Sequence, residues 1–220
     1  MMSAHSEPAG RATLPVIVAI VGASGAGKSW LATQLRTQLG PHSARLSLDD
    51  FYRDRSHLPE ARRAQLNFDH PRAIDWSAVQ TVLESCRSGR SAAVPIYDFA
   101  THTRCGLQDW EPKPVVLMDG LWLLHRPRLR PLFDLKIYLE CPAHLCFERR
   151  LARDVEERGR SEASVRQQFF GMVLPMFEQF VAPQSRWADL VLRETPGPLQ
   201  VQQIMDRLLH LLQQRNPDRV

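Results

Sequence analysis

Lysine is scarce in this chain of 220 residues. Only three are present, Lys28, Lys113 and Lys136, so arginine makes up nearly all of the 28 basic residues. Long apolar runs are missing too, because the longest, Val16–Val21, is far shorter than the roughly 18 to 20 residues of a membrane helix. The N-terminus has no basic segment followed by an apolar region, which argues against a secretory signal. We therefore expect a soluble, cytoplasmic chain with no membrane partner.

Cysteine and clustered charge are also limited. The four cysteines form no CxxC pair and no zinc-like spacing; they are Cys86, Cys105, Cys141 and Cys146. We therefore expect reduced thiols and neither a metal nor a disulfide framework. The net charge is +4 and the isoelectric point is about 9.1, but the basic residues are spread along the chain instead of forming a tail. We therefore expect no nucleic-acid partner.

Short apolar segments alternate with longer amphipathic ones. We expect strands at Val16–Val21, Ala44–Leu48, Val115–Met118, Leu135–Leu139 and Asp189–Leu192, and helices at Lys28–Leu39, Ile74–Ser88, Pro142–Asp154, Ser161–Phe180 and Leu199–Gln214. Asp75 should cap the second helix and Gly89 should close it. This alternation predicts an α/β fold, a parallel five-stranded sheet with helices on both faces.

Another pattern interrupts this order. Ala92–Phe99 and Gly106–Trp110 flank a polar tip at Thr101–Arg104, which predicts a β-hairpin inserted at about residues 92–111. Residues 1–14 are small and polar and are expected to form a flexible N-terminal tail. Residues 15–215 are then expected to form a single domain.

Residues 22–29 match the Walker A motif G-x-x-x-x-G-K-[ST] between a predicted strand and a predicted helix. The motif consists of Gly22, Ala23, Ser24, Gly25, Ala26, Gly27, Lys28 and Ser29. In such a P-loop the backbone N–H groups cradle the phosphates of ATP or GTP, Lys28 reaches the β- and γ-phosphates, and Ser29 ligates Mg²⁺. Asp119 follows the strand Val115–Met118 and is a candidate metal ligand, directly or through water.

A triphosphate site is common to kinases, GTPase switches, ATPase motors and helicases, so other residues must distinguish them. Asp49 and Asp50 follow the second strand, where the carboxyl ends of strands line a ligand crevice. Asp49 is a candidate for the group that takes the proton from an attacking hydroxyl. Helix capping or a solvated turn is the alternative interpretation of either aspartate.

Four segments then follow in a specific order: Asp49–Tyr52, Asn67–Pro71, Pro95–Phe99 with His102–Arg104, and Arg153–Asp154 with Glu157–Arg160. Together they resemble the uridine-cytidine kinases, within the wider phosphoribulokinase/uridine kinase group, from about Val16 to Leu192. The resemblance implies a P-loop NTPase-type fold that uses Mg²⁺ and ATP or GTP. It also implies phosphorylation of the 5′-hydroxyl of uridine or cytidine to UMP or CMP in pyrimidine salvage, and it suggests a homotetramer.

The resemblance also assigns roles to single residues. Asp49 corresponds to the general base, and Asp69 to the carboxylate that holds the ribose hydroxyls. Nucleoside contacts are implied for Tyr52, Phe68, Tyr97, Phe99, His102, Arg150, Arg160 and Gln168. The arginine-rich stretch at about 150–162 corresponds to a lid over ATP, in which Arg153 and Arg158 steady the transferring phosphoryl group. From the pattern alone, a salt-bridged, solvated helix face is the alternative interpretation of this stretch.

One position departs from the family. Where its members typically carry Glu-Gly after the third core strand, this chain has Asp119-Gly120, whose shorter side chain changes the reach to the metal by roughly an ångström. Two alternatives therefore stay open. One is a related kinase for another alcohol, such as nicotinamide riboside, pantothenate or ribulose phosphate, and the other is a nucleotide-binding regulatory protein that has lost catalysis.

Overall fold

The structure is a computed structural model that describes residues 14–63, 65–157 and 159–215. The strands are β1 (Val16–Gly22), β2 (Ser43–Ser47), β3 (Ala92–Asp98), β4 (Thr103–Trp110), β5 (Val115–Gly120), β6 (Leu135–Leu139) and β7 (Leu190–Leu192). The α-helices are α1 (Lys28–Leu39), α2 (Glu60–Arg63), α3 (Trp76–Arg87), α4 (Ala143–Glu156), α5 (Glu162–Gln168), α6 (Leu174–Met176) and α7 (Pro198–Arg215).

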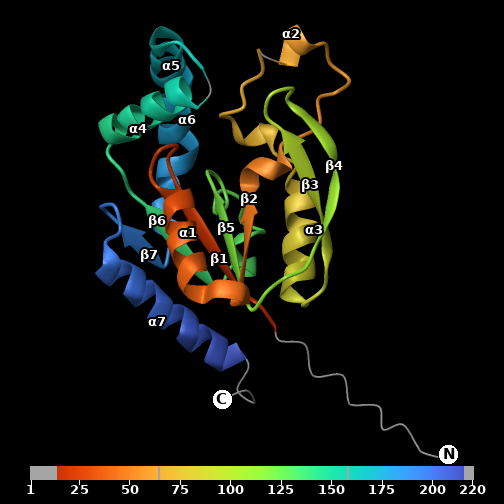
Figure 1. The fold of residues 1–220 in the computed structure, drawn as a ribbon, viewed down its shortest axis with the longest axis vertical. Coiled ribbons are helices and arrows are strands. Elements are labelled where there is room, and N and C mark those ends of the chain that lie inside the picture. Colours follow the sequence, from red (N-terminus) through yellow and green to blue (C-terminus); the bar gives the residue numbers. More distant parts are fainter. Residues whose placement is uncertain (1–13, 64, 158, 216–220) are drawn as a thin grey trace, which may run out of the picture.

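A parallel five-stranded sheet forms the centre of the fold (Figure 1). Its strand order is β2-β5-β1-β6-β7, and each neighbouring pair is parallel. Strands β3 and β4 pair antiparallel and form a separate hairpin beside α3. The predicted α/β class, with its parallel five-stranded sheet and inserted hairpin, is therefore confirmed.

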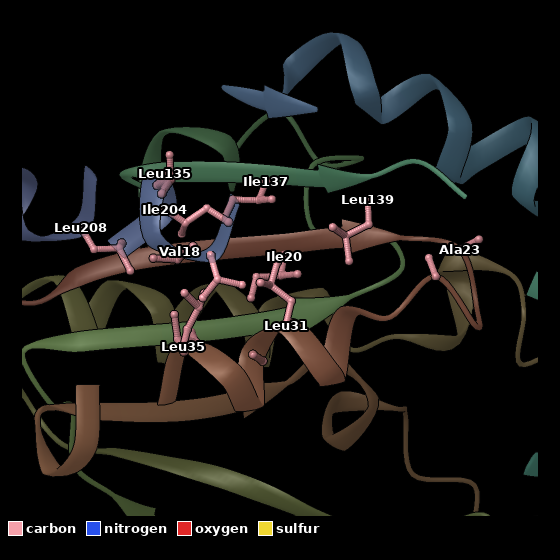
Figure 2. Packing of buried hydrophobic residues seen from close by; sticks show 14 of the residues in the cluster. Val18, Ile20, Ala23, Leu31, Leu35, Leu135, Ile137, Leu139, Ile204 and Leu208 are labelled. Carbon is pink, nitrogen blue, oxygen red and sulfur yellow. The ribbon is translucent and has the colours of Figure 1, made fainter. Parts of the chain in front are cut away.

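Both faces of the sheet are covered because strand β1 is apolar on both of its sides. All seven of its residues are buried, and alternate side chains point into two different hydrophobic clusters. Val18 and Ile20 pack with α1 and α7 on one face, which Figure 2 shows, whereas Ile17 and Val21 pack with α3 on the other. Each such apolar side chain contributes about 1.5–3 kcal/mol when fully buried. The sheet is therefore a rigid base for the loops at its carboxyl edge.

Two expected elements differ from the structure. The helix expected at Ser161–Phe180 is not continuously α-helical, because wider π-turns at Phe169–Val173 and Phe177–Val181 follow α5 and enclose α6. Pro175 in α6 has no N–H to donate, so a regular hydrogen-bond ladder is interrupted there. The second hairpin strand begins at Thr103 instead of Gly106, since His102 turns the chain with a left-handed φ of 55°.

The other boundaries agree with the sequence pattern to within two residues. The Asp75 side chain caps α3 by accepting a hydrogen bond from the Ala78 N–H, and Gly89 follows the helix with a φ of 66°. The expected tail, except for Leu14, lies outside the described residues. None of the helices in the described ranges combines the length and apolar character needed to cross a membrane.

Candidate active site

A cleft of about 850 Å³ opens at the carboxyl edge of the sheet, and most of the predicted site residues line it. They are Ser24, Gly25, Gly27, Lys28, Ser29, Asp49, Tyr52, Phe68, Asp69, Tyr97, Phe99, His102, Asp119, Arg150, Arg153, Arg160 and Gln168. Gly22, Ala23 and Ala26 of the P-loop are buried behind it. Arg158 lies outside the described residues. In Figure 1, α4 and α5 stand on one side of this edge, and α2 and the hairpin stand on the other.

The P-loop connects the buried end of β1 to the first turn of α1. Gly25 has a φ of 84°, and a Cβ there would lie 2.6 Å from the carbonyl oxygen of Cys146 in α4. Glycine therefore permits both the turn and the close approach of α4. Lys28 donates from Nζ to the Ala23 carbonyl at 2.7 Å. Burial lowers the pKa of Lys28, whereas the negative charges of Asp49 and Asp119 raise it.

Ser29 and Asp119 offer the oxygen ligands that Mg²⁺ prefers. The Ser29 hydroxyl donates to Asp119 Oδ2 at 3.1 Å, and the Asp119 side chain is only 6% exposed. In the described parts of the chain, no group of three or more His, Cys, Asp or Glu has an arrangement suited to a metal. Two oxygen ligands leave most positions of an octahedral Mg²⁺ to water and to the phosphates of a nucleotide, so Ser29 and Asp119 fit such a shared metal. Arg45 in β2 contacts both of them, which the sequence analysis did not anticipate.

Asp49 follows β2 in the 3₁₀ turn η2 (Leu48–Phe51). Ser47 fixes the start of the turn by accepting a hydrogen bond from the Asp49 N–H at 3.2 Å. A Cβ at Gly120 would collide with Leu48, so glycine at the end of β5 allows η2 to pack against it. Burial is the main cause of the lowered pKa of Lys28 and of the raised pKa of Tyr52; the negative charge of Asp49 opposes the first shift and adds to the second. Asp49 lines the same cleft as both residues.

Aromatic rings form the end of the cleft away from the P-loop. Phe68 and His102 stack with ring centroids 4.3 Å apart and an interplanar angle of 16°. The Tyr52 hydroxyl donates to the Phe68 carbonyl at 3.1 Å, and Tyr97 packs edge-on against Phe99. Burial and the charge of Arg63 lower the pKa of His102, which favours a neutral imidazole. The Tyr97 hydroxyl is buried, and none of the described residues provides it with a hydrogen-bond partner.

Arg104 fastens the hairpin to the segment that carries Asp49. Its Nε donates to the Tyr52 carbonyl at 2.8 Å, and its Nη1 lies 3.1 Å from Asp75 Oδ2 at the start of α3. Arg104 Nη2 also donates to the Phe51 carbonyl at 3.3 Å. One guanidinium therefore fixes the distance between the aromatic end of the cleft and the residues after β2.

Arg150 connects the P-loop to Asp69 and Gln168. Its Nη1 donates to the Ser24 hydroxyl at 3.3 Å and lies 3.8 Å from Asp69 Oδ1, while Nη2 donates to Gln168 Oε1 at 3.2 Å. Burial raises the pKa of Asp69, and the opposing charge of Arg150 lowers it. The Asp69 carboxylate therefore faces a guanidinium that also contacts Ser24 and Gln168.

Asp154 is a second residue whose role the sequence analysis missed. Its side chain is fully buried, and ion pairs at 3.4, 2.8 and 3.6 Å join it to Arg150, Arg153 and Arg160. The three arginines are thus grouped around one carboxylate instead of forming a separate, solvated face. The only sequence signal was an acidic residue among arginines, which cannot distinguish a buried partner from an exposed one.

Comparisons with known proteins bear on this arrangement. Residues 17–199 match the model of the phosphoribulokinase/uridine kinase family. A uridine kinase from Haemophilus influenzae (strain PittGG) is 37% identical over 207 residues, which cover 91% of this chain and 97% of that protein. A uridine kinase from Shewanella sp. (strain ANA-3) is 39% identical over 204 residues, covering 90% and 96%. Phosphoribulokinase from Rhodobacter spheroides shares the fold with a TM-score of 0.60 at 17% identity, over 81% of this chain and 69% of that one.

Proposed function

The chain belongs to the phosphoribulokinase/uridine kinase family, and we propose that it transfers the γ-phosphoryl group of ATP or GTP to the 5′-hydroxyl of uridine or cytidine. The observation that carries this proposal is a single cleft with two chemically different ends. One end has the P-loop with Lys28 and Ser29, and the other has aromatic rings with Asp69 and His102. Asp49 lines the same cleft, and we assign it to the point where the acceptor hydroxyl and the γ-phosphate would meet.

In the proposed reaction, the 5′-oxygen of the nucleoside forms a bond to the γ-phosphorus as the bond to the β,γ-bridging oxygen breaks. The hydroxyl proton passes to Asp49, and the nucleoside diphosphate leaves. Lys28 and Arg153 stabilise the charge on the phosphoryl oxygens. We propose the same role for Arg158, as predicted from the sequence.

The acceptor end favours an uncharged substrate. Asp69 would accept hydrogen bonds from the two ribose hydroxyls, and the Tyr97 hydroxyl and His102 would face the edge of the pyrimidine. Arg150 is shared among Asp69, Asp154 and Gln168, so little positive charge remains for an acceptor that already carries a phosphate. This arrangement argues for a nucleoside over a sugar phosphate.

Membership of this kinase family implies small-molecule substrates, ATP as the phosphate donor and Mg²⁺ as the usual cofactor. Ser29 and Asp119 would hold the metal, which neutralises phosphate charge when bound. The use of GTP, the homotetramer and the cytoplasmic location stay predictions.

A panel of acceptors tests the proposal. The purified protein with Mg²⁺ and ATP is supplied with uridine, cytidine, nicotinamide riboside, pantothenate or ribulose phosphate, and the nucleoside diphosphate formed is measured. We expect turnover with uridine or cytidine. Turnover with one of the other alcohols alone would contradict the assigned acceptor, and ATP binding without turnover of any acceptor would favour a regulatory protein.

A further inference from the structure

Arg45 brings a positive charge to the candidate metal site from the middle of strand β2. It pairs with Leu117 in the β2–β5 register, so Asp119 lies two residues farther along β5 on the same face of the sheet. Arg45 Nε donates to Asp119 Oδ1 at 2.7 Å, and Nη2 donates to Oδ2 at 3.0 Å. The same Nη2 lies 3.0 Å from the Ser29 hydroxyl oxygen. Arg45, Ser29 and Asp119 thus form a closed network.

This network uses the atoms that a metal would need. A guanidinium bound in this two-pronged way engages both oxygens of the carboxylate. A divalent cation held by Ser29 and Asp119 would lie within a few ångströms of the Arg45 charge, where two like charges repel strongly because the site is partly desolvated. Full coordination of the metal therefore requires Arg45 to give up at least one of its bonds to Asp119.

The surroundings of Arg45 allow such a movement. Its side chain is 30% exposed, so it is not locked in the core, whereas the Asp119 side chain is 6% exposed. The charges of Asp50 and Asp49 also act on Arg45 and raise its pKa after the larger effect of Asp119. Negative charge other than that of Asp119 therefore also acts on the guanidinium.

We propose that Arg45 competes with the divalent cation for Asp119 and keeps the metal site closed until a metal–nucleotide complex displaces it. This proposal rests on one part of the proposed function, the assignment of the metal to Ser29 and Asp119. If so, Arg45 lowers the affinity of the site for the metal. Removal of its guanidinium should then strengthen metal binding.

Binding of Mn²⁺ to the full-length protein tests the proposal without reference to activity. Free Mn²⁺ is measured by electron paramagnetic resonance, first without nucleotide. The measurement is then repeated with a non-hydrolysable ATP analogue, with the protein in excess over the analogue. We expect Arg45→Met to lower the Kd for Mn²⁺ by about tenfold or more. Arg36→Met removes the same charge from an exposed position on α1 and should change the Kd by less than about twofold.

A second substitution at Arg45 and a double variant with Asp119 complete the test. Arg45→Gln retains a hydrogen-bond donor beside the buried carboxylate, so it serves if Arg45→Met does not fold, and it should also tighten Mn²⁺ binding. In an Asp119→Asn background, replacement of Arg45 should change the Kd by less than it does in the wild type, because the contested carboxylate is gone and only the repulsion between the Arg45 charge and the metal remains.

Two results would overturn the proposal in different ways. Equal or weaker Mn²⁺ binding by both Arg45 variants, with normal binding by the wild type, would mean that Arg45 only holds Asp119 in position. No Mn²⁺ binding by the wild type or either variant, while the ATP analogue still binds, would refute both the proposal and the metal assignment on which it rests. The acceptor panel would then still report on the proposed kinase activity separately.

Discussion

Asp154 Oδ1 accepts two hydrogen bonds from Arg153, one from Nε at 2.9 Å and one from Nη2 at 2.8 Å, although the two residues are neighbours in the chain. The pairing holds the Arg153 guanidinium against a carboxylate of α4 that is fully buried. Arg150 and Arg160 approach the same carboxylate. The orientation of the arginines that face the P-loop therefore depends on one acidic residue that does not line the cleft.

Asp154→Asn should accordingly impair both stability and turnover. Removal of one partner from a buried ion-pair cluster leaves the arginines uncompensated, so the free energy of unfolding should fall by about 3 kcal/mol. Because the arginines lose their common acceptor, kcat should fall by about tenfold to a hundredfold at a temperature where the variant is folded. Thermal unfolding and steady-state kinetics with uridine measure the two effects.

Glu162→Gln provides the matched control for this substitution. Glu162 pairs with Arg166 across one helical turn of α5, but both side chains are more than half exposed. Such surface pairs contribute little, so this variant should match the wild type in unfolding temperature and in kcat. A kcat for Asp154→Asn that equals that of the control would contradict the positioning role of Asp154.

The sequence was most informative where a local signal determines a local structure. Helix α1 was predicted to begin at Lys28, directly after the P-loop, and to end at Leu39, and the structure has the same bounds. The strand order and the contacts of Arg45 with Asp119 depend instead on which strands become neighbours. The apolar strand Ala44–Leu48 contained one arginine, but its partner could be identified only once the register of β2 and β5 was known.

Asp49→Asn tests the proposed general base. The amide cannot accept the hydroxyl proton, so kcat should fall by about a hundredfold to ten-thousandfold, while the affinity for ATP should change little. Asp50→Asn changes the neighbouring carboxylate, which is not one of the side chains that line the cleft, and should retain most of the kcat. Equal losses in the two variants would show that Asp49 has no special role in proton transfer.

His102→Phe should affect the acceptor more than the chemical step. Phenylalanine keeps a ring to stack on Phe68 but removes both ring nitrogens, so the KM for uridine and cytidine should rise by about tenfold to a hundredfold. The KM for ATP should stay unchanged. Leu107→Ala, at an exposed position on the same hairpin, is the control and should leave both KM values unaltered.

The pH dependence of the same KM gives an independent check on His102. Burial and the charge of Arg63 lower the pKa of His102 from its ordinary value of 6.5, so the neutral imidazole predominates above that pH. The KM for uridine should therefore change little between about pH 7 and pH 8. It should rise only at lower pH, as His102 becomes protonated, and this rise should be absent in His102→Phe. A rise centred above pH 7 would contradict the lowered pKa.

Asp50 should make stability depend on pH in the direction opposite to most carboxylates. Burial and the adjacent charge of Asp49 raise the pKa of Asp50 from 3.8 to about 6. Its folded-state pKa is above the unfolded value, so its contribution to stability is complete below about pH 4 and is lost as the pH rises through 6. Asp50→Asn should therefore be more stable than the wild type at pH 7.5. Discounted for solvent screening, the gain is about 1 kcal/mol, or roughly 2–4 °C in Tm.

Asp54 supplies the control of opposite sign. Hydrogen bonds from the Ser56 hydroxyl and N–H lower the pKa of Asp54, so its contribution is present at neutral pH and is lost as the pH falls through its folded-state pKa. Asp54→Asn should thus lower the Tm at pH 7.5, and the difference from the wild type should disappear at acidic pH. Thermal unfolding of both variants and the wild type between about pH 2 and pH 8, followed by circular dichroism, measures the two slopes. A Tm for Asp50→Asn below that of the wild type at pH 7.5 would mean that the Asp50 carboxylate stabilises the fold through its charge, since a buried carboxylate with a raised pKa must do the reverse.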